Sequence, residues 1–159
     1  MLNQRFFTPG EVAELIKLNI LTVYEYIKLK KLPAIRFGRK YRIAESDFDS
    51  SQYLFNGARY PQAVYLLCQA IEKILKAAIV EFTKKAPKKI HRLENLAKES
   101  KLKISENQYD IFTDISKHYS RVRYPDISGV SYNTKKKVEP IMKSGKEIYL
   151  WIRKQLKNQ

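Results

Sequence analysis

Hydrophobic and polar positions in residues 6–46 follow two different periods in succession. Between residues 8 and 32, apolar side chains recur at helical spacing, which predicts two short helices, and Asn19 is placed to cap the second. From residue 35 to residue 43, apolar and basic residues alternate on either side of Gly38. Alternation with a period of two is typical of a β-hairpin, so this segment predicts a pair of short strands.

The rest of the chain carries a helical pattern and no alternating run of strand length. Apolar residues after Pro61 are dense enough to cover most of a helix, which is expected of a central element. The economical arrangement of such helices is an antiparallel bundle, and the predicted fold class is mainly α. The first predicted helix is residues 47–57, and Ser46 with Asp49 caps its start. A long helix follows from Pro61, and a short helix follows His91. Ser105 with Gln108 caps the next helix, and a final helix lies near 135–157.

The excess of basic residues and their distribution along the chain indicate the class of partner. The net charge is +15 and the pI is about 9.8, which favours an anionic partner such as nucleic acid. Residues 1–46 hold nine Lys/Arg and four Asp/Glu, and residues 47–159 hold 22 and 12, so both predicted domains are basic. The change of pattern near residue 46 predicts two domains, residues 1–46 and a helical domain at 47–159.

Other classes of protein find little support in the sequence. The single cysteine, Cys68, excludes an internal disulfide and a cysteine-rich zinc site, and we expect it to be buried as a small hydrophobe. No segment is long and apolar enough to predict a membrane span, and the first residues lack a signal-peptide pattern. We expect a cytoplasmic protein without metal or cofactor and with no membrane partner.

The first segment resembles the excisionase/MerR-type winged helix-turn-helix. The residues that carry the resemblance are EVAELI, then TVYEYI after Asn19, then KLPAIRFGRKYRI. Lys17 stands where the family often has a turn glycine. The resemblance implies that the helix opening at Asn19 enters a major groove and that the basic wing lies along phosphates of double-stranded DNA. The implied DNA-binding residues are Asn19, Ile20, Leu21, Thr22, Tyr24, Arg36, Arg39, Lys40 and Arg42.

Two of these residues leave an alternative open. Ile20 and Leu21 occupy positions that polar base-reading side chains would usually hold, and aliphatic groups can contact thymine methyls but donate no hydrogen bonds. They could instead pack on a protein surface, and the chain would then be a non-enzymatic interaction adaptor.

The second segment is similar to the HEPN family of small helical bundles. The residues that carry the likeness are NGARYPQAVYLLCQAIEKILKAAI, IHRLENLAKESKL and YDIFTDISKHYSRVRYPD. The resemblance implies a homodimer formed through the bundle. It also implies one of three roles: ribonuclease, partner of a nucleotidyltransferase in a toxin–antitoxin system, or non-catalytic binder of RNA or nucleotide.

The ribonuclease motif of that family, Arg followed by four to six residues and His, is not matched. The nearest Arg before His91 is Arg59, and the nearest before His118 is Arg92. His91 is therefore expected to cap the short helix. A weak catalytic set remains at His118, Arg121 and Arg123, where a core role for His118 is the alternative. The candidate residues for binding RNA or nucleotide are His118, Arg121, Arg123, Tyr124 and Asp126.

These features together favour a DNA-binding protein, either a transcriptional regulator or a component of a toxin–antitoxin or defence module. Its HEPN-like domain would form the dimer and bind RNA, nucleotide or protein. The enzyme alternative is a HEPN-type ribonuclease targeted by its helix-turn-helix.

Overall fold

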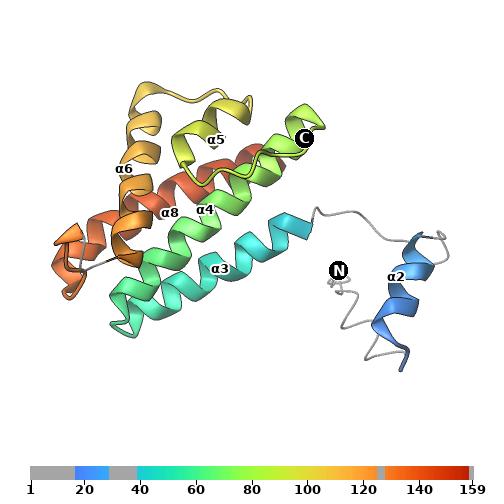
Figure 1. The fold of residues 1–159 in the computed structure, drawn as a ribbon, viewed down its shortest axis with the longest axis horizontal. Helices are drawn as coiled ribbons and strands as arrows, with labels where there is room; N and C mark the ends of the chain where they lie inside the picture. Colours follow the sequence, from blue (N-terminus) through green and yellow to red (C-terminus); the bar gives the residue numbers. More distant parts are fainter. Residues whose placement is uncertain (1–16, 29–38, 125–127, 158–159) are drawn as a thin grey trace, which may run out of the picture. The chain divides into compact units, whose positions relative to one another are not determined.

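A computed structural model describes residues 17–28, 39–124 and 128–157. The chain divides into two units, residues 1–36 and 37–159, and each is described by itself. All regular elements of the described ranges are helices (Figure 1). They are α2 (Ile20–Lys28), α3 (Arg39–Asn56), α4 (Tyr60–Thr83), α5 (Leu93–Glu99), α6 (Glu106–Arg123) and α8 (Lys135–Lys157).

Helix α2 belongs to the first unit and begins where the sequence predicts. The side-chain oxygen of Asn19 accepts a hydrogen bond of 2.9 Å from the amide of Leu21, and the Asn19 carbonyl accepts from Thr22 and Val23. An amide donor left free at a helix start is satisfied by such a cap. Val23 is fully buried, so this short helix has one buried face.

The predicted β-hairpin wing is wrong for the part that the structure describes. Helix α3 begins at Arg39, so residues 39–43 of the predicted hairpin are helical, and there is no strand among the described residues. The predicted first strand, residues 35–37, lies outside the described residues. The Ser46 cap is also wrong, because α3 runs through that position.

The helical face of α3 explains this outcome. Ala44, Phe48 and Ser51 follow one another at helical spacing and are buried where α3 packs along α4. Three alternating residues carry too little information to distinguish a strand from a helix, and burial of this face favours helix. The Phe48 ring also stacks on that of Tyr149 from α8, with centroids 4.1 Å apart.

Helix α4 is the central element, as the density of apolar residues predicts. It packs against α3, α5, α6 and α8, and Pro61 occupies its first turn, where the missing amide costs nothing (Figure 1). It ends at Lys84, whose φ of 56° is left-handed and whose amide donates to the Val80 carbonyl. Its buried residues are Ala63, Val64, Leu67, Cys68, Ala70, Ile71, Glu72, Ile74, Leu75, Ala78 and Ile79.

Helices α5 and α6 follow their predicted starts. The Ser105 side chain accepts from the Gln108 amide while the Gln108 side chain accepts from the Ser105 amide, which is the predicted capping box. Phe112, Ile115 and Tyr119 then form the buried face of α6.

Helix α8 covers the core with a narrow, regular apolar face. Ile148 and Ile152 are buried, and Ile141, Trp151 and Leu156 pack partly against the core. Gly145 is also buried on this face, and a Cβ placed there would lie 2.4 Å from Cδ2 of Leu67 on α4. The glycine therefore permits close approach of the two helices. Among the described helices, none is long and apolar enough to cross a membrane.

Candidate functional site

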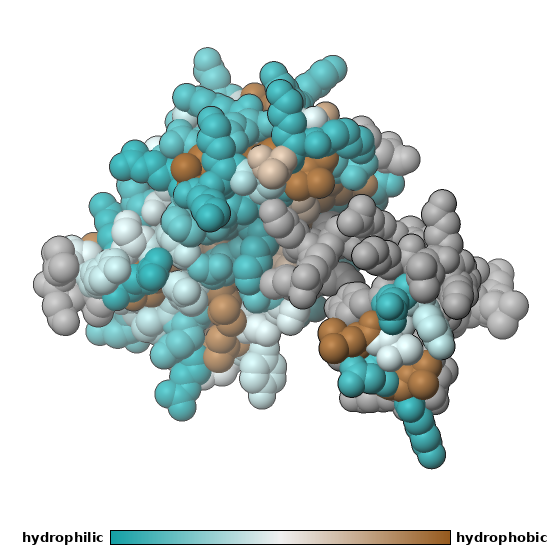
Figure 2. Space-filling view, turned by 45° about the vertical axis from the view of Figure 1, so that its right-hand side comes forward, coloured by the Kyte–Doolittle hydropathy of each residue, from teal (hydrophilic) through white to brown (hydrophobic). Residues whose placement is uncertain are grey.

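The first turn of α2 presents the predicted reading positions. Leu21 is 71% exposed, Glu25 is exposed and Thr22 is half-buried, whereas Val23 faces inward. An exposed leucine in the first turn of a recognition helix can contact a thymine methyl group. Figure 2 shows hydrophobic surface in this part of the chain. Arg36 lies outside the described residues, and so do the side chains of Ile20, Tyr24, Arg39, Lys40 and Arg42.

Lys17 adopts the turn conformation that the resemblance to helix-turn-helix proteins implies. Its φ is 52°, in the left-handed region where glycine has no steric penalty. A lysine there is strained by about 1 kcal/mol, so the turn is set by the surrounding fold and not by local preference.

The predicted cluster around His118 separates into two environments. The His118 Nδ1 is hydrogen-bonded to the Tyr132 hydroxyl at 2.8 Å, its Nε2 lies 3.6 Å from Asp114 Oδ2, and the side chain is 13% exposed. Burial lowers the pKa of His118 below its usual 6.5, against the raising effect of Asp114. The lowered pKa favours the neutral imidazole, and Nδ1 is engaged in a structural contact with Tyr132.

Arg123 lies in the other environment. Its guanidinium is 5.6 Å from the centroid of the Tyr119 ring and 5.9 Å from that of Tyr124, which is 54% exposed. A cation over an aromatic face at such a distance is attracted to the ring. Arg121 is half-buried, and Asp126 lies outside the described residues, so its predicted place in the binding site stays a prediction.

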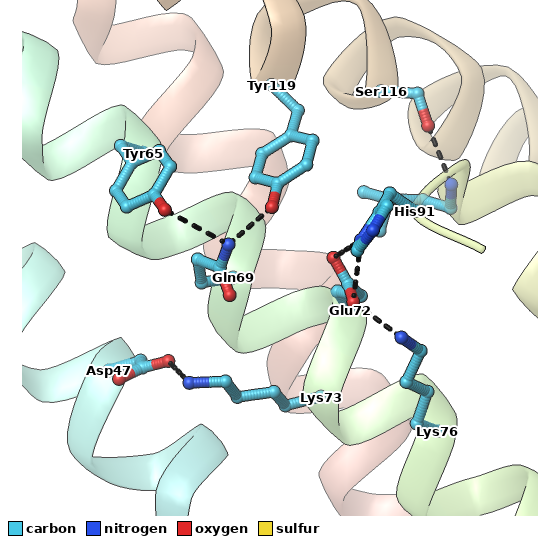
Figure 3. Close-up of polar contacts among 10 residues, drawn as sticks. Asp47, Tyr65, Gln69, Glu72, Lys73, Lys76, His91, Ser116 and Tyr119 are labelled. Atoms are coloured by element: carbon cyan, nitrogen blue, oxygen red, sulfur yellow. Dashed lines mark hydrogen bonds and ion pairs between the residues drawn. The ribbon is translucent and has the colours of Figure 1, made fainter. Parts of the chain in front are cut away.

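Sequence reasoning missed a second polar group that combines Glu72, Lys76 and His91 (Figure 3). The Glu72 carboxylate is buried and accepts from Lys76 Nζ at 2.6 Å. It also lies 3.1 and 3.2 Å from the His91 Nδ1. His91 was expected to cap α5, but the N-cap residue is Arg92, without a side-chain bond.

Tyr119 joins this group to Arg123. Its ring stacks on Tyr65 with centroids 5.9 Å apart and lies 6.1 Å from the His91 ring, while its hydroxyl accepts from Gln69 (Figure 3). Burial raises the pKa of Tyr119, and the nearby Glu72 charge acts in the same direction. We define the Tyr119 cluster by the six residues Tyr65, Gln69, Glu72, His91, Tyr119 and Arg123.

The chemistry of the Tyr119 cluster follows from which of its atoms are engaged. The carboxylate fixes His91 through Nδ1, the side chain is 63% exposed, and the described residues give Nε2 no hydrogen-bond partner. An imidazole oriented in this way can accept a proton or bind a phosphate oxygen at Nε2. Arg123 adds a planar cation and the tyrosines add stacking surface, which together suit phosphate and base groups.

The Tyr119 cluster was hard to foresee because its parts are distant in the sequence. Glu72 and His91 are 19 positions apart, and Gln69 and Tyr119 are 50 apart. The only signal was that AIEKILKA, IHRL and HYSRVRY all fall within the segments that carry the HEPN resemblance. Among the residues the structure describes, no group of three or more His, Cys, Asp or Glu is placed to hold a metal.

Comparison with known families agrees with this architecture. The family model described as HEPN domain matches residues 39–155, and one described as helix-turn-helix domain matches residues 6–51. The first match covers most of the chain and the second covers the segment that contains α2. The fold and these matches define a DNA-binding protein that carries an all-helical module. The chain belongs to the HEPN family, and the predicted fusion of an excisionase-like helix-turn-helix with a HEPN domain is confirmed.

Two solved structures share the fold of the bundle. TT1696 from Thermus thermophilus has a TM-score of 0.62 at 17% identity, covering 72% of this chain and 94% of its own. ST0689, an archaeal HEPN homologue, has a TM-score of 0.57 at 24% identity, covering 73% and 93%.

A curated relative shares only a short segment. YvgK from Bacillus subtilis (strain 168), an uncharacterized protein, is 48% identical over 50 residues, which are 31% of this chain and 16% of that protein. The chain thus spans less than a fifth of the length of this relative.

Proposed function

We propose that this protein is a DNA-binding regulator, or the DNA-binding component of a toxin–antitoxin or defence module, that acts in the cytoplasm. The observation that carries the proposal is the capped start of α2. There Asn19 orders the first turn and Leu21 is exposed, within a segment that matches the helix-turn-helix domain. An ordered helix start with exposed side chains is what major-groove reading requires.

The HEPN bundle has two roles in this proposal. It pairs two copies of the chain, which would place two readers on one duplex and raise the effective concentration of the second after the first has bound. It also binds RNA or a nucleotide at the Tyr119 cluster, where Arg123 offers a planar cation and His91 a ring nitrogen beside stacked rings. A nucleotidyltransferase is the proposed protein partner in the toxin–antitoxin case.

The test of DNA reading compares two exposed apolar residues. A duplex selected from a random library by the full chain is titrated with the parent, with Leu21→Ser and with Tyr53→Ser, a bundle residue that is 79% exposed. We expect Leu21→Ser to weaken binding to the selected duplex and Tyr53→Ser to leave it unchanged. If Leu21→Ser releases a co-purifying protein and keeps full DNA affinity, the adaptor function replaces this one.

The pairing of Glu72 with His91 favours the ribonuclease as the second candidate. His91 Nε2 would take the proton of an RNA 2′-hydroxyl, whose oxygen bonds to phosphorus as the bond to the 5′-oxygen breaks; the 5′-oxygen takes a proton from water and a 2′,3′-cyclic phosphate remains. Arg123 would stabilise the charge on the attacked phosphate. Cleavage of single-stranded RNA that is lost in His91→Asn and retained in His118→Asn would establish it. Loss only in His118→Asn would assign the activity to the cluster predicted from sequence, and no cleavage by the parent would remove the enzyme.

A further inference from the structure

The solvent-facing side of α8 carries five exposed lysines and also both glutamates of the helix, Glu139 and Glu147. Lys136, Lys143 and Lys154 fall within about 20° of one another around the helix axis, at about 100° per residue. Lys146 and Lys157 flank this row, and all five residues are exposed. We call these five residues the α8 basic face. The opposite side of the helix is the apolar stripe that packs into the bundle.

The charge of the bundle is concentrated on this helix. Residues 135–157 contain eight Lys/Arg and two Glu, whereas the rest of residues 47–159 contain fourteen Lys/Arg and ten Asp/Glu. The concentration is therefore a property of α8 and not of the whole surface.

The lysines of the α8 basic face also lack the acidic partners that neutralise other cations. Lys73 pairs with Asp47 at 2.5 Å, Lys88 with Glu99 at 2.7 Å, and Arg153 with Glu45. Among the described residues, none of the five lysines lies within ion-pair distance of a carboxylate; Glu139 on the same side of α8 is 3.8 Å from Lys135. Five lysines against two glutamates leave this side of α8 with a net positive charge.

We propose that the α8 basic face binds the phosphate backbone of duplex DNA without reading its sequence. From Lys136 to Lys157 the helix rises about 32 Å, close to the roughly 34–36 Å of one duplex turn. The inference rests on the proposed function, because α2 would bring the duplex to the protein. Each lysine that contacts a phosphate releases a counterion and strengthens the salt dependence of binding.

Two other occupants fit this surface less well. A second copy of α8 would place lysines against lysines, which is unfavourable. A helix that lies on a membrane surface inserts its apolar face into the lipid. The apolar face of α8 is instead buried in the bundle, and the large hydrophobic residue on its exposed side is Leu150, at 40% exposure. A membrane surface therefore fits α8 less well than duplex DNA.

The experiment measures the salt dependence of duplex binding by the full chain. The test variant combines Lys136→Gln, Lys143→Gln and Lys154→Gln. The matched control removes the same charge at the exposed residues Lys85, Lys103 and Lys117, also as glutamine. The slope of log Kd against log salt is measured on the selected duplex and on a scrambled one of equal length, and circular dichroism verifies folding.

We expect the test variant to reduce the slope by about 2–3, at about 0.9 per lost phosphate contact, equally on both duplexes. The control should change it by less than about 1. Equal slopes for test and control would overturn the inference, even where Leu21→Ser still weakens selected binding and the proposed function stands. Loss of binding in the α8 variant alone, with Leu21→Ser unaffected, would retain the inference and refute reading by α2. An α8-dependent affinity for vesicles rich in phosphatidylserine, without any effect on DNA, would also overturn it.

Discussion

Replacing Gly145 with alanine tests whether the close contact between α8 and α4 is as tight as the structure indicates. The added Cβ would lie 2.4 Å from Cδ2 and 2.9 Å from Cγ of Leu67, whose side chain is fully buried. Both distances are shorter than real carbon contacts, so Leu67 or the helix must move. Overpacking of this kind costs about 1–3 kcal/mol, while alanine in a helix gains about 1 kcal/mol over glycine. We expect a net loss of up to about 2 kcal/mol of unfolding free energy.

A second substitution makes the prediction sharper. In a Leu67→Ala background the obstructing atoms are gone, and Gly145→Ala should then stabilise by up to about 1 kcal/mol through helix propensity. The sign of its effect therefore reverses between the two backgrounds. A double-mutant cycle from urea denaturation, followed by circular dichroism, measures the coupling between the two positions.

Gly57 provides the matched control. A Cβ at Gly57 would lie 3.5 Å from its nearest neighbour, an ordinary contact, and the residue is exposed. Gly57→Ala should be neutral or stabilise by up to about 1 kcal/mol. The reasoning about Gly145 is refuted if Gly145→Ala behaves like Gly57→Ala, or if it destabilises equally with and without Leu67.

Three further predictions concern single residues. Burial lowers the pKa of His118 below 6.5 in the folded protein, so its contribution to stability is present above pH 6.5 and is lost as the pH falls through the folded pKa. The unfolding free energy of His118→Gln should therefore fall less between pH 7 and 5 than that of the parent. An equal fall in both proteins would contradict this. Burial raises the pKa of the Cys68 thiol to about 12, so a thiolate-specific reagent should label native protein only as fast as it opens, and labelling at the rate seen in denaturant would disprove the burial. Lys17→Gly should relieve about 1 kcal/mol of left-handed strain, and hydrogen exchange of α2 amides that is no slower than in the parent would argue against it.

Local features of the fold could be predicted because they depend on neighbouring residues. The Asn19 cap and the Ser105–Gln108 capping box each join positions two or three apart, and both are present. The bounds of the final helix, near 135–157, also followed from its apolar spacing. The wing failed because residues 41–43 carry a strand-like alternation that the packing of Ala44 and Phe48 on α4 overrides.

The site shows the same division between local and distant contacts. His118, with Ile111, Ile115 and Val122 near it in sequence, allowed a core role to be weighed in advance, and its contact with Tyr132 agrees with that alternative. The Glu72–His91 contact could not be predicted, because no local pattern connects a residue in the middle of α4 with one that precedes α5. The sequence likewise left open whether Leu21 faces DNA or a protein, and its 71% exposure is compatible with either.

The position of α8 in the chain has a consequence for biosynthesis. Helix α4 comes early in the chain, and α8, which packs against its Leu67, is the last of the helices that the structure describes. Translation must therefore continue for more than fifty residues after Thr83 before Val138 is added, and still further before Ile148 and Ile152. During that interval an apolar face of α4 in the nascent chain is exposed to water, where chaperones or other unfolded chains can bind it.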